Sequence, residues 1–212
     1  LTNTRNSSFV QGVLKAGYIF GAVERAESYV DWLLGYRDQL LTLSNSIAEE
    51  DKKHVLMHTY GAKYFANGTD MTLTVYKPAD PLGQAAILGG TYNVYNSIAA
   101  EDITSSNVYG ATVSVDVILG DNTTVDYIFL HMVRYTYGAS EVMSTPKHGY
   151  LINDTTEAQT GHAAVKNLEF VESTMSPYLV AGEFRNGCTG GVLLGAFIGS
   201  IVNPEVYKDV DP

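Results

Sequence analysis

Residues 109 to 137 read YGATVSVDVILGDNTTVDYIFLHMVRYTY, and this stretch decides the fold that the sequence predicts. From Ala111 to Leu119 apolar and polar side chains largely alternate, with the period of two that is typical of a strand with one face on a core. The next residues, 120 to 122, are Gly-Asp-Asn, which are typical of turns. The return run from Val125 to Tyr135 is rich in β-branched and aromatic residues at odd and even positions, so we expect both of its faces to be covered. The stretch therefore predicts a β-hairpin at the centre of a sheet.

Helical patterns precede this hairpin in the chain. From Phe9 onward, apolar residues recur at alternating spacings of three and four, which predicts one helix of roughly 35 residues, or two helices with a break near Gly35. The sequence Ser46-Ile47-Ala48-Glu49 has the form of a capping box, with Ser at the helix start and Glu three residues later. It predicts a further helix from about Ile47 to Phe65.

The order of these elements predicts the fold class. Helices come first and strands afterwards, which is typical of α+β proteins rather than of alternating α/β proteins. We therefore expect a long N-terminal helix, or two helices, followed by a mainly antiparallel sheet centred on the 109–137 hairpin. We further expect residues 1–66 to form a helical arm or layer and residues 67–212 to form a β-rich domain, the two packing as one structural unit.

The composition argues against several classes of function. The 212 residues carry a net charge of −10 and only 17% of them are charged, so we expect no nucleic-acid partner, which would need clustered Lys and Arg. The single cysteine excludes an internal disulfide and a cysteine-cluster metal site. No run of about 18 apolar residues occurs, so the sequence predicts no membrane-spanning helix.

Several features favour an extracellular or cell-surface protein. The chain starts at Leu1 rather than Met, which we interpret as a processed N-terminus, although a trimmed start would look the same. Abundant Tyr, Gly, Thr and Ser are typical of β-rich extracellular proteins. Sequons for glycosylation support the same interpretation, although they could also occur by chance; the candidates are Asn6, Asn67, Asn122 and Asn153.

Candidate catalytic and metal-binding residues are few. His54 and His58 are four residues apart on a predicted helix, the spacing that lets two imidazoles share a metal ion, but the zincin motif needs Glu where Val55 stands. Ser140 lacks the second glycine of the hydrolase elbow, and Cys188 has no neighbouring His. We therefore expect no enzymatic activity, no metal ion and no cofactor.

Tyrosines on or beside the predicted strands offer a candidate ligand site. Their side chains combine apolar bulk with a polar hydroxyl, as small-molecule pockets and subunit interfaces both require, although filling of the core is the alternative. Such a pocket would suit a polar organic ligand. The candidate residues are Tyr92, Tyr95, Tyr127, Tyr135 and Arg134.

Two glycine-containing apolar segments, one near each end of the chain, favour assembly. Glycines four residues apart on a helix let another helix approach closely, as at positions 17 and 21 and again at positions 191, 195 and 199. Burial inside the same domain is the alternative for both segments. The candidate interface residues are Phe9, Val13, Gly17, Phe20, Gly21, Gly191, Leu194, Gly195, Phe197 and Ile198.

These observations predict a non-enzymatic, extracytoplasmic structural subunit that assembles with copies of itself into a filament, surface layer or virion. The alternative is an extracytoplasmic small-molecule-binding sensor domain of a membrane receptor, with a closed pocket lined by the tyrosines. A small enzyme of the helix-plus-sheet cone type ranks third, and it would need His and carboxylate side chains that converge in that pocket.

Overall fold

The computed structural model describes residues 4–60, 72–120, 124–132, 178–181 and 188–210. The chain divides into two compact units, each built from several segments. The first unit comprises Leu1–Lys52, Pro81–Thr91 and Glu183–Pro212, and the second comprises Lys53–Asp80 and Tyr92–Gly182.

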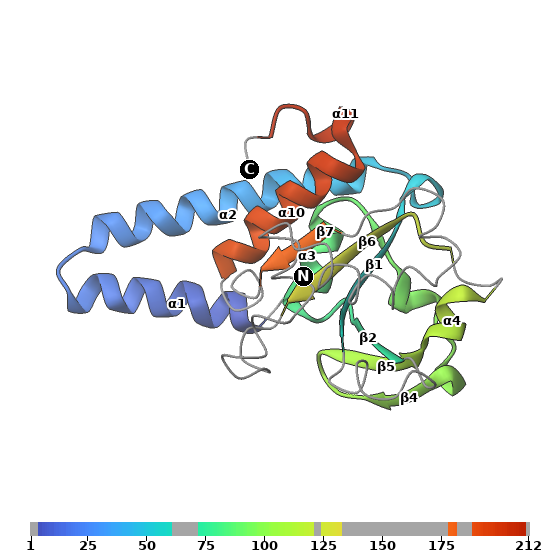
Figure 1. Cartoon of the computed structure of the whole chain (residues 1–212). Helices are drawn as coiled ribbons and strands as arrows, with labels where there is room; N and C mark the ends of the chain where they lie inside the picture. The colour runs from blue at the N-terminus through green and yellow to red at the C-terminus, as the bar shows by residue number, and fades with distance from the viewer. Residues whose placement is uncertain (1–3, 61–71, 121–123, 133–177, 182–187, 211–212) are drawn as a thin grey trace, which may run out of the picture. The chain divides into compact units, whose positions relative to one another are not determined.

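The first unit is helical, and its largest feature is a hairpin of two helices, α1 (Thr4–Ile19) and α2 (Val23–Ser46), shown in Figure 1. The helices separate at Gly21, whose φ of 65° lies in the left-handed region that glycine adopts without strain. The predicted break near Gly35 is wrong, because Gly35 lies inside α2 at a position where an added Cβ would meet no atom within 4 Å. Of the two alternatives, a single long helix or two helices, the structure has two.

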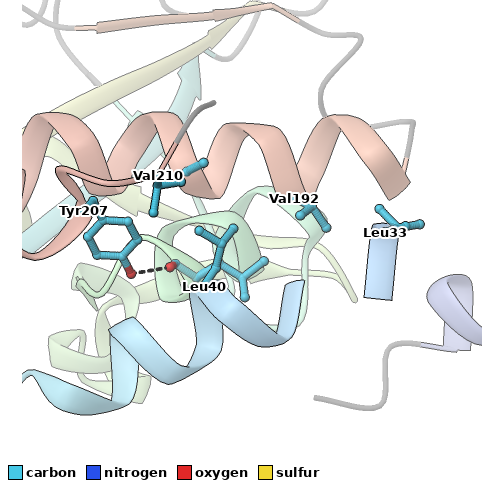
Figure 2. Packing of buried hydrophobic residues seen from close by; sticks show 7 residues of the cluster. Leu33, Leu40, Val192, Tyr207 and Val210 are labelled. Atoms are coloured by element: carbon cyan, nitrogen blue, oxygen red, sulfur yellow. Dashed lines mark hydrogen bonds between the residues drawn. The ribbon is translucent and has the colours of Figure 1, made fainter. Parts of the chain in front are cut away.

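Three further helices pack with the hairpin in the first unit: α3 (Pro81–Leu88), α10 (Cys188–Val202) and α11 (Pro204–Tyr207). Figure 2 shows the buried cluster that joins them, with Leu40 of α2 beside Tyr207 and Val210. The Tyr207 hydroxyl, inside this cluster, donates a hydrogen bond of 2.5 Å to the carbonyl of Leu88. An aromatic side chain thus fills the core and satisfies a carbonyl at the end of α3.

The other carbonyls at the C-terminal end of α3 also have side-chain donors. The Ser44 hydroxyl donates to the carbonyl of Ile87 at 2.7 Å. The amide of Asn203 donates to the carbonyls of Gly89 at 2.9 Å and Gly90 at 3.2 Å. The end of a buried helix leaves carbonyls without partners inside the helix, so these donors from distant segments stabilise the unit.

The apolar C-terminal segment is a helix, and its glycines lie where other parts of the first unit approach it. A Cβ on Gly195 would lie 2.7 Å from Cβ of Leu88 on α3. A Cβ on Gly199 would overlap the ring of Tyr207 on α11. The segment is therefore buried against its own unit, which was the alternative to burial against a neighbouring copy.

The second unit contains a mixed sheet, which has seven strands among the described residues. They are β1 (His54–Tyr60), β2 (Thr72–Tyr76), β3 (Tyr92–Asn93), β4 (Ile103–Ser106), β5 (Gly110–Ser114), β6 (Tyr127–Met132) and β7 (Tyr178–Ala181). The order is β4-β5-β2-β1-β6-β7, with β3 paired to β1. The pairs β1–β2, β2–β5 and β4–β5 are antiparallel, whereas β1–β3, β1–β6 and β6–β7 are parallel. The α+β class is confirmed, but a mainly antiparallel sheet is not.

The predicted 109–137 hairpin is wrong in its pairing. Residues of both arms do form strands, but β5 pairs with β2 and β4, and β6 pairs with β1 and β7. The first arm also ends early, because Val115–Leu119 forms the short helix α4. The Ser114 hydroxyl caps this helix by accepting a hydrogen bond from the Asp116 N–H at 3.3 Å.

The helix predicted from Ile47 to Phe65 is also wrong, because strand β1 occupies its centre. Ser46 is the last residue of α2 and its hydroxyl donates to the Leu43 carbonyl, so it does not start a new helix. Between α2 and β1 the chain forms only a short 3-10 turn, Glu49–Asp51, and two further 3-10 turns lie at Val94–Ser97 and Ala100–Asp102. In β1 the four residues from Val55 to His58 are each 0% exposed. A strand buried on both faces lacks the alternation by which strands are recognised.

Candidate functional site

The N-terminal ends of the parallel strands carry a half-exposed polar cluster. The Asp126 carboxylate, just before β6, accepts the backbone N–H of His54 at 2.7 Å and lies 3.5 Å from Nδ1 of the same residue. The backbone N–H of Asp126 in turn donates to the His54 carbonyl at 2.8 Å. The ring of Tyr92, on the neighbouring strand β3, lies 4.8 Å from the imidazole of His54. These contacts fix the register of β1 against β6 at this edge.

A second polar pair lies inside the sheet. The Tyr76 hydroxyl of β2 is 2.7 Å from Nδ1 of His131 on β6, and the two residues are 3% and 2% exposed. Either atom can be the donor, depending on the tautomer of the imidazole. The hydrogen bond fixes the orientation of the His131 ring, because imidazole nitrogens lie in the ring plane.

The register places a third buried side chain, His58, on the opposite face of the sheet. His58 pairs with Leu130 on β6, and neighbours in a register share a face. His131 follows Leu130 on β6, so its side chain points to the other face of the sheet, where it meets Tyr76. The two buried histidines do not converge on one site, and the described residues hold no cluster of three metal-ligating side chains.

The parallel strands share their C-terminal edge. β1 ends at Tyr60, β6 at Met132 and β7 at Ala181, and the last residue of β5, Ser114, lies at the same edge through its pairing with Thr72. In open sheets with parallel strands, ligands bind at this edge, where the connections leave the strands. His131 is one residue inside the edge, so its hydrogen bond with Tyr76 lies directly beneath it.

The fold of the chain is similar to that of periplasmic solute-binding proteins. A periplasmic solute-binding protein from Veillonella parvula matches 94% of this chain with a TM-score of 0.60 and 17% identity, and this chain covers 51% of it. The TroA-like periplasmic binding protein FepB from the same species matches 99% of this chain with a TM-score of 0.62 and 14% identity, and 56% of its own length is covered.

A third solved structure of this fold contains a ligand. The molybdate periplasmic binding protein MolA from Haemophilus influenzae, bound to molybdate, matches 100% of this chain with a TM-score of 0.56 and 14% identity. This chain covers 55% of it, so the chain spans little more than half the length of these three proteins. No protein-family model and no curated protein matches the sequence. The likeness is therefore one of fold.

This fold corrects the prediction of a self-assembling structural subunit. The similar structures are periplasmic binding proteins and not filament or surface-layer subunits. The physical basis of the prediction also fails for the C-terminal segment, because Leu194 is 2% exposed and Ile198 is 0% exposed within one chain. Solute-binding proteins are not enzymes, and the prediction of a non-enzymatic protein agrees with this fold.

The predicted interface residues have different surroundings in the structure. Phe9 is partly buried against the core cluster, and a Cβ on Gly17 would meet Ala26 of α2. Gly21 forms the turn between α1 and α2, and Phe20 beside it is 80% exposed. The other members lie on α1 or α10: Val13, Gly191 and Gly195 are at least partly covered, whereas Phe197 is 45% exposed.

The two histidines proposed to share a metal ion lie on a strand. His54 and His58 are four residues apart on β1, which separates their Cα atoms by about 13 Å at 3.3 Å per residue. The helical spacing on which the metal site depended is absent. His54 instead contacts Asp126 and Tyr92, and His58 is fully buried.

The predicted tyrosine pocket does not form as one group among the described residues. Tyr92 pairs with His54 and Tyr127 pairs with Val55, so they flank β1 on opposite faces. Tyr95 lies in a 3-10 turn, and its ring is 5.7 Å from the ammonium of Lys77. Tyr135 and Arg134 lie outside the described residues.

Other candidate residues are only partly described. Asn6 is in α1, whereas Asn67, Asn122, Asn153 and Ser140 lie outside the described residues, so glycosylation stays a prediction. Cys188 begins α10. The Tyr76–His131 pair could not be predicted from the sequence, because the partners are 55 residues apart and no local pattern joins them.

Proposed function

We propose that this chain is an extracytoplasmic, non-enzymatic solute-recognition protein that binds a small molecule at the C-terminal edge of the parallel strands β1, β6 and β7. The observation that carries the proposal is the fold, which matches nearly the whole chain to solute-binding proteins. Small-molecule binding was the alternative function that the sequence predicted, at a pocket lined by tyrosines. We now propose the ends of the parallel strands as the binding site.

The topology of the sheet supports this location. Three parallel strands and the end of β5 meet at one edge, and in sheets with parallel strands ligands bind at the carboxyl ends of the strands. The opposite edge is held by reciprocal hydrogen bonds between His54 and Asp126, which suit a structural role. Beneath the binding edge, the Tyr76–His131 hydrogen bond keeps a polar side chain in a fixed orientation, as a preformed site requires.

The chemistry of the solute follows less directly from the fold. One similar protein binds molybdate, an oxyanion. A screen should therefore cover oxyanions, transition-metal salts, tetrapyrroles and polar organic solutes.

The first experiment measures thermal unfolding of the chain with sodium molybdate, zinc chloride, hemin and fractions of a small-molecule extract from the source organism. A solute at a hundred times its dissociation constant stabilises the folded state by about 2.7 kcal/mol, which raises the melting temperature by several degrees. Hits are then titrated by calorimetry. A chain for which no salt, tetrapyrrole or extract fraction shifts the transition would contradict the proposal.

Two substitutions at opposite ends of β6 locate the site. His131→Gln changes the side chain beneath the proposed binding edge, and Asp126→Asn changes the polar cluster at the other edge. We expect His131→Gln to weaken solute binding at least about tenfold, the loss of roughly one good hydrogen bond, and Asp126→Asn to leave the affinity unchanged. Circular dichroism confirms that both variants are folded. The opposite order of effects would place the solute at the N-terminal edge.

A further inference from the structure

The turn between α1 and α2 presents consecutive large apolar side chains to solvent. Tyr18 is 81% exposed, Ile19 72% and Phe20 80%, and Val23 at the start of α2 is 41% exposed. Scattered apolar residues are normal on protein surfaces, but a contiguous exposed group is typical of a surface that contacts a membrane or another protein. Figure 1 shows this turn at one end of the helical hairpin.

The turn lies away from the apolar core of its own unit. Of the hairpin residues that pack on the core cluster, Phe9 is ten positions from Ile19 along α1, and Tyr29 is six positions from Val23 along α2. At 1.5 Å per residue these separations are about 15 Å and about 9 Å. Packing in the first unit therefore leaves the three apolar side chains uncovered.

Three backbone N–H groups of the turn have acceptors in α1, whereas no side chain caps the start of α2. The Gly21 N–H donates to the Tyr18 carbonyl at 3.3 Å and the Ala22 N–H donates to the Gly17 carbonyl at 2.7 Å, which together form a Schellman motif. The Phe20 N–H donates to the Ala16 carbonyl at 2.9 Å. Polar backbone groups that enter a lipid bilayer must be satisfied internally, and these donors already are.

The charge of this region distinguishes it from the rest of the chain. Residues 1 to 23 contain Arg5 and Lys15 and no acidic residue, although the whole chain carries a net charge of −10. Beyond the turn, Glu24 and Arg25 offset each other at the start of α2. A basic helix that ends in an apolar aromatic turn is complementary to a membrane surface with anionic headgroups.

We propose that the α1–α2 turn is a membrane-contact element, in which Tyr18, Ile19 and Phe20 enter the headgroup region of an anionic bilayer and Lys15 lies against the lipid phosphates. Aromatic side chains favour this depth, where an apolar ring and a polar group are both solvated. The contact would hold a solute-recognition unit at a membrane surface. The part of the chain that the structure describes contains no helix long and apolar enough to cross a membrane.

Sedimentation with lipid vesicles tests the proposal. The full chain is mixed at about 0.1 M salt with vesicles of phosphatidylcholine alone or of an equimolar mixture with phosphatidylglycerol. We expect stronger binding to the anionic vesicles, and the triple variant Tyr18→Ser, Ile19→Ser, Phe20→Ser should bind at least about tenfold more weakly because its apolar area is lost. Lys15→Glu should weaken binding to anionic vesicles only.

A matched control uses exposed apolar residues elsewhere in the chain. Val108 and Tyr109, between β4 and β5, are 71% and 38% exposed, and the double variant Val108→Ser, Tyr109→Ser should bind vesicles like the wild type. Light scattering of the wild type and the triple variant in solution provides a second measurement. The proposal would be overturned if the wild type did not bind vesicles, or if the triple variant bound them equally well. It would also be overturned if the wild type were a dimer in solution and the triple variant a monomer, because the apolar turn would then be a contact between copies of the chain.

The depth of insertion can be measured with a single fluorophore. Trp32, the only tryptophan, lies on α2 about 14 Å from Val23 along the helix axis. In the double variant Trp32→Phe, Phe20→Trp the fluorophore moves to the turn. We expect brominated lipids to quench this variant strongly and the wild type weakly. Equal quenching of both proteins would contradict insertion through the turn.

Discussion

The hydroxyl of Tyr76 lies 2.7 Å from Nδ1 of His131, although strand β1 separates the strands that carry the two residues. Both side chains are buried, so the hydrogen bond forms in a region of low dielectric constant, where such bonds are strong and unsatisfied partners are costly. It joins β2 to β6 across β1, beneath the edge at which we place the solute.

Tyr76→Phe tests the contribution of this hydrogen bond to stability. The substitution keeps the ring but removes the hydroxyl from a buried imidazole, so the free energy of unfolding should fall by about 1–3 kcal/mol. Urea denaturation measures the change. Tyr18→Phe, which alters an 81% exposed tyrosine, is the control and should change stability by less than about 0.5 kcal/mol.

Tyr207 makes the stability of the first unit depend on pH. Burial raises the pKa of the Tyr207 hydroxyl above its ordinary value of 10.0, so the folded chain retains a proton that the unfolded chain loses. The stabilisation is complete below about pH 10, and above it the free energy of unfolding should fall by about 1.4 kcal/mol per pH unit until the folded-state pKa is reached. Denaturation at several alkaline pH values measures this slope.

The variant Tyr207→Phe separates this residue from the other tyrosines. It lacks the titrating hydroxyl and the hydrogen bond to the Leu88 carbonyl, so it should be less stable at neutral pH by about 1–2 kcal/mol. Its slope above pH 10 should be smaller than that of the wild type by the contribution of one proton. Identical slopes in the two proteins would show that Tyr207 does not cause the alkaline loss.

Two glycine-to-alanine substitutions should have opposite effects. In Gly199→Ala the new methyl group would overlap the Tyr207 ring, and overpacking of this kind typically costs about 1–3 kcal/mol. Gly35→Ala adds a methyl group in open space within a helix and should raise stability by about 0.5–1 kcal/mol. Thermal and urea unfolding of the two variants measure both changes, and a neutral Gly199→Ala would contradict the close packing of α10 on α11.

The helical ends of the chain could be predicted from sequence because their signals are local. Apolar periodicity predicted helices in the N-terminal region. For the C-terminal apolar segment the sequence left helix and strand open, and its glycines predicted close packing only if it formed a helix. The position of the break was wrong because glycine is tolerated within a helix, as at Gly35, whereas Gly21 adopts the left-handed conformation that ends α1. Which surface covers a helix is not a local property, and this led to the wrong prediction of assembly.

The sheet could be predicted only in part because its pairings are distant. β1 pairs in parallel with β6, with Val55 opposite Tyr127, more than 70 positions away along the chain. Parallel pairs need long connections, whereas sequence patterns favour the interpretation of adjacent strands as a hairpin. The candidate site depends on these pairings, so neither the shared edge nor the Tyr76–His131 contact could be read from the sequence.

Hydrogen exchange with and without the bound solute tests the central claim most directly. The chain is saturated with the molecule that raises its melting temperature, and exchange is followed by mass spectrometry. We expect slower exchange in peptides that contain the strand ends at Tyr60, Met132 and Ala181, and no change in peptides that contain Tyr92 or Asp126. Protection confined to the N-terminal edge or to the helical unit would contradict solute recognition at the C-terminal edge of the parallel strands.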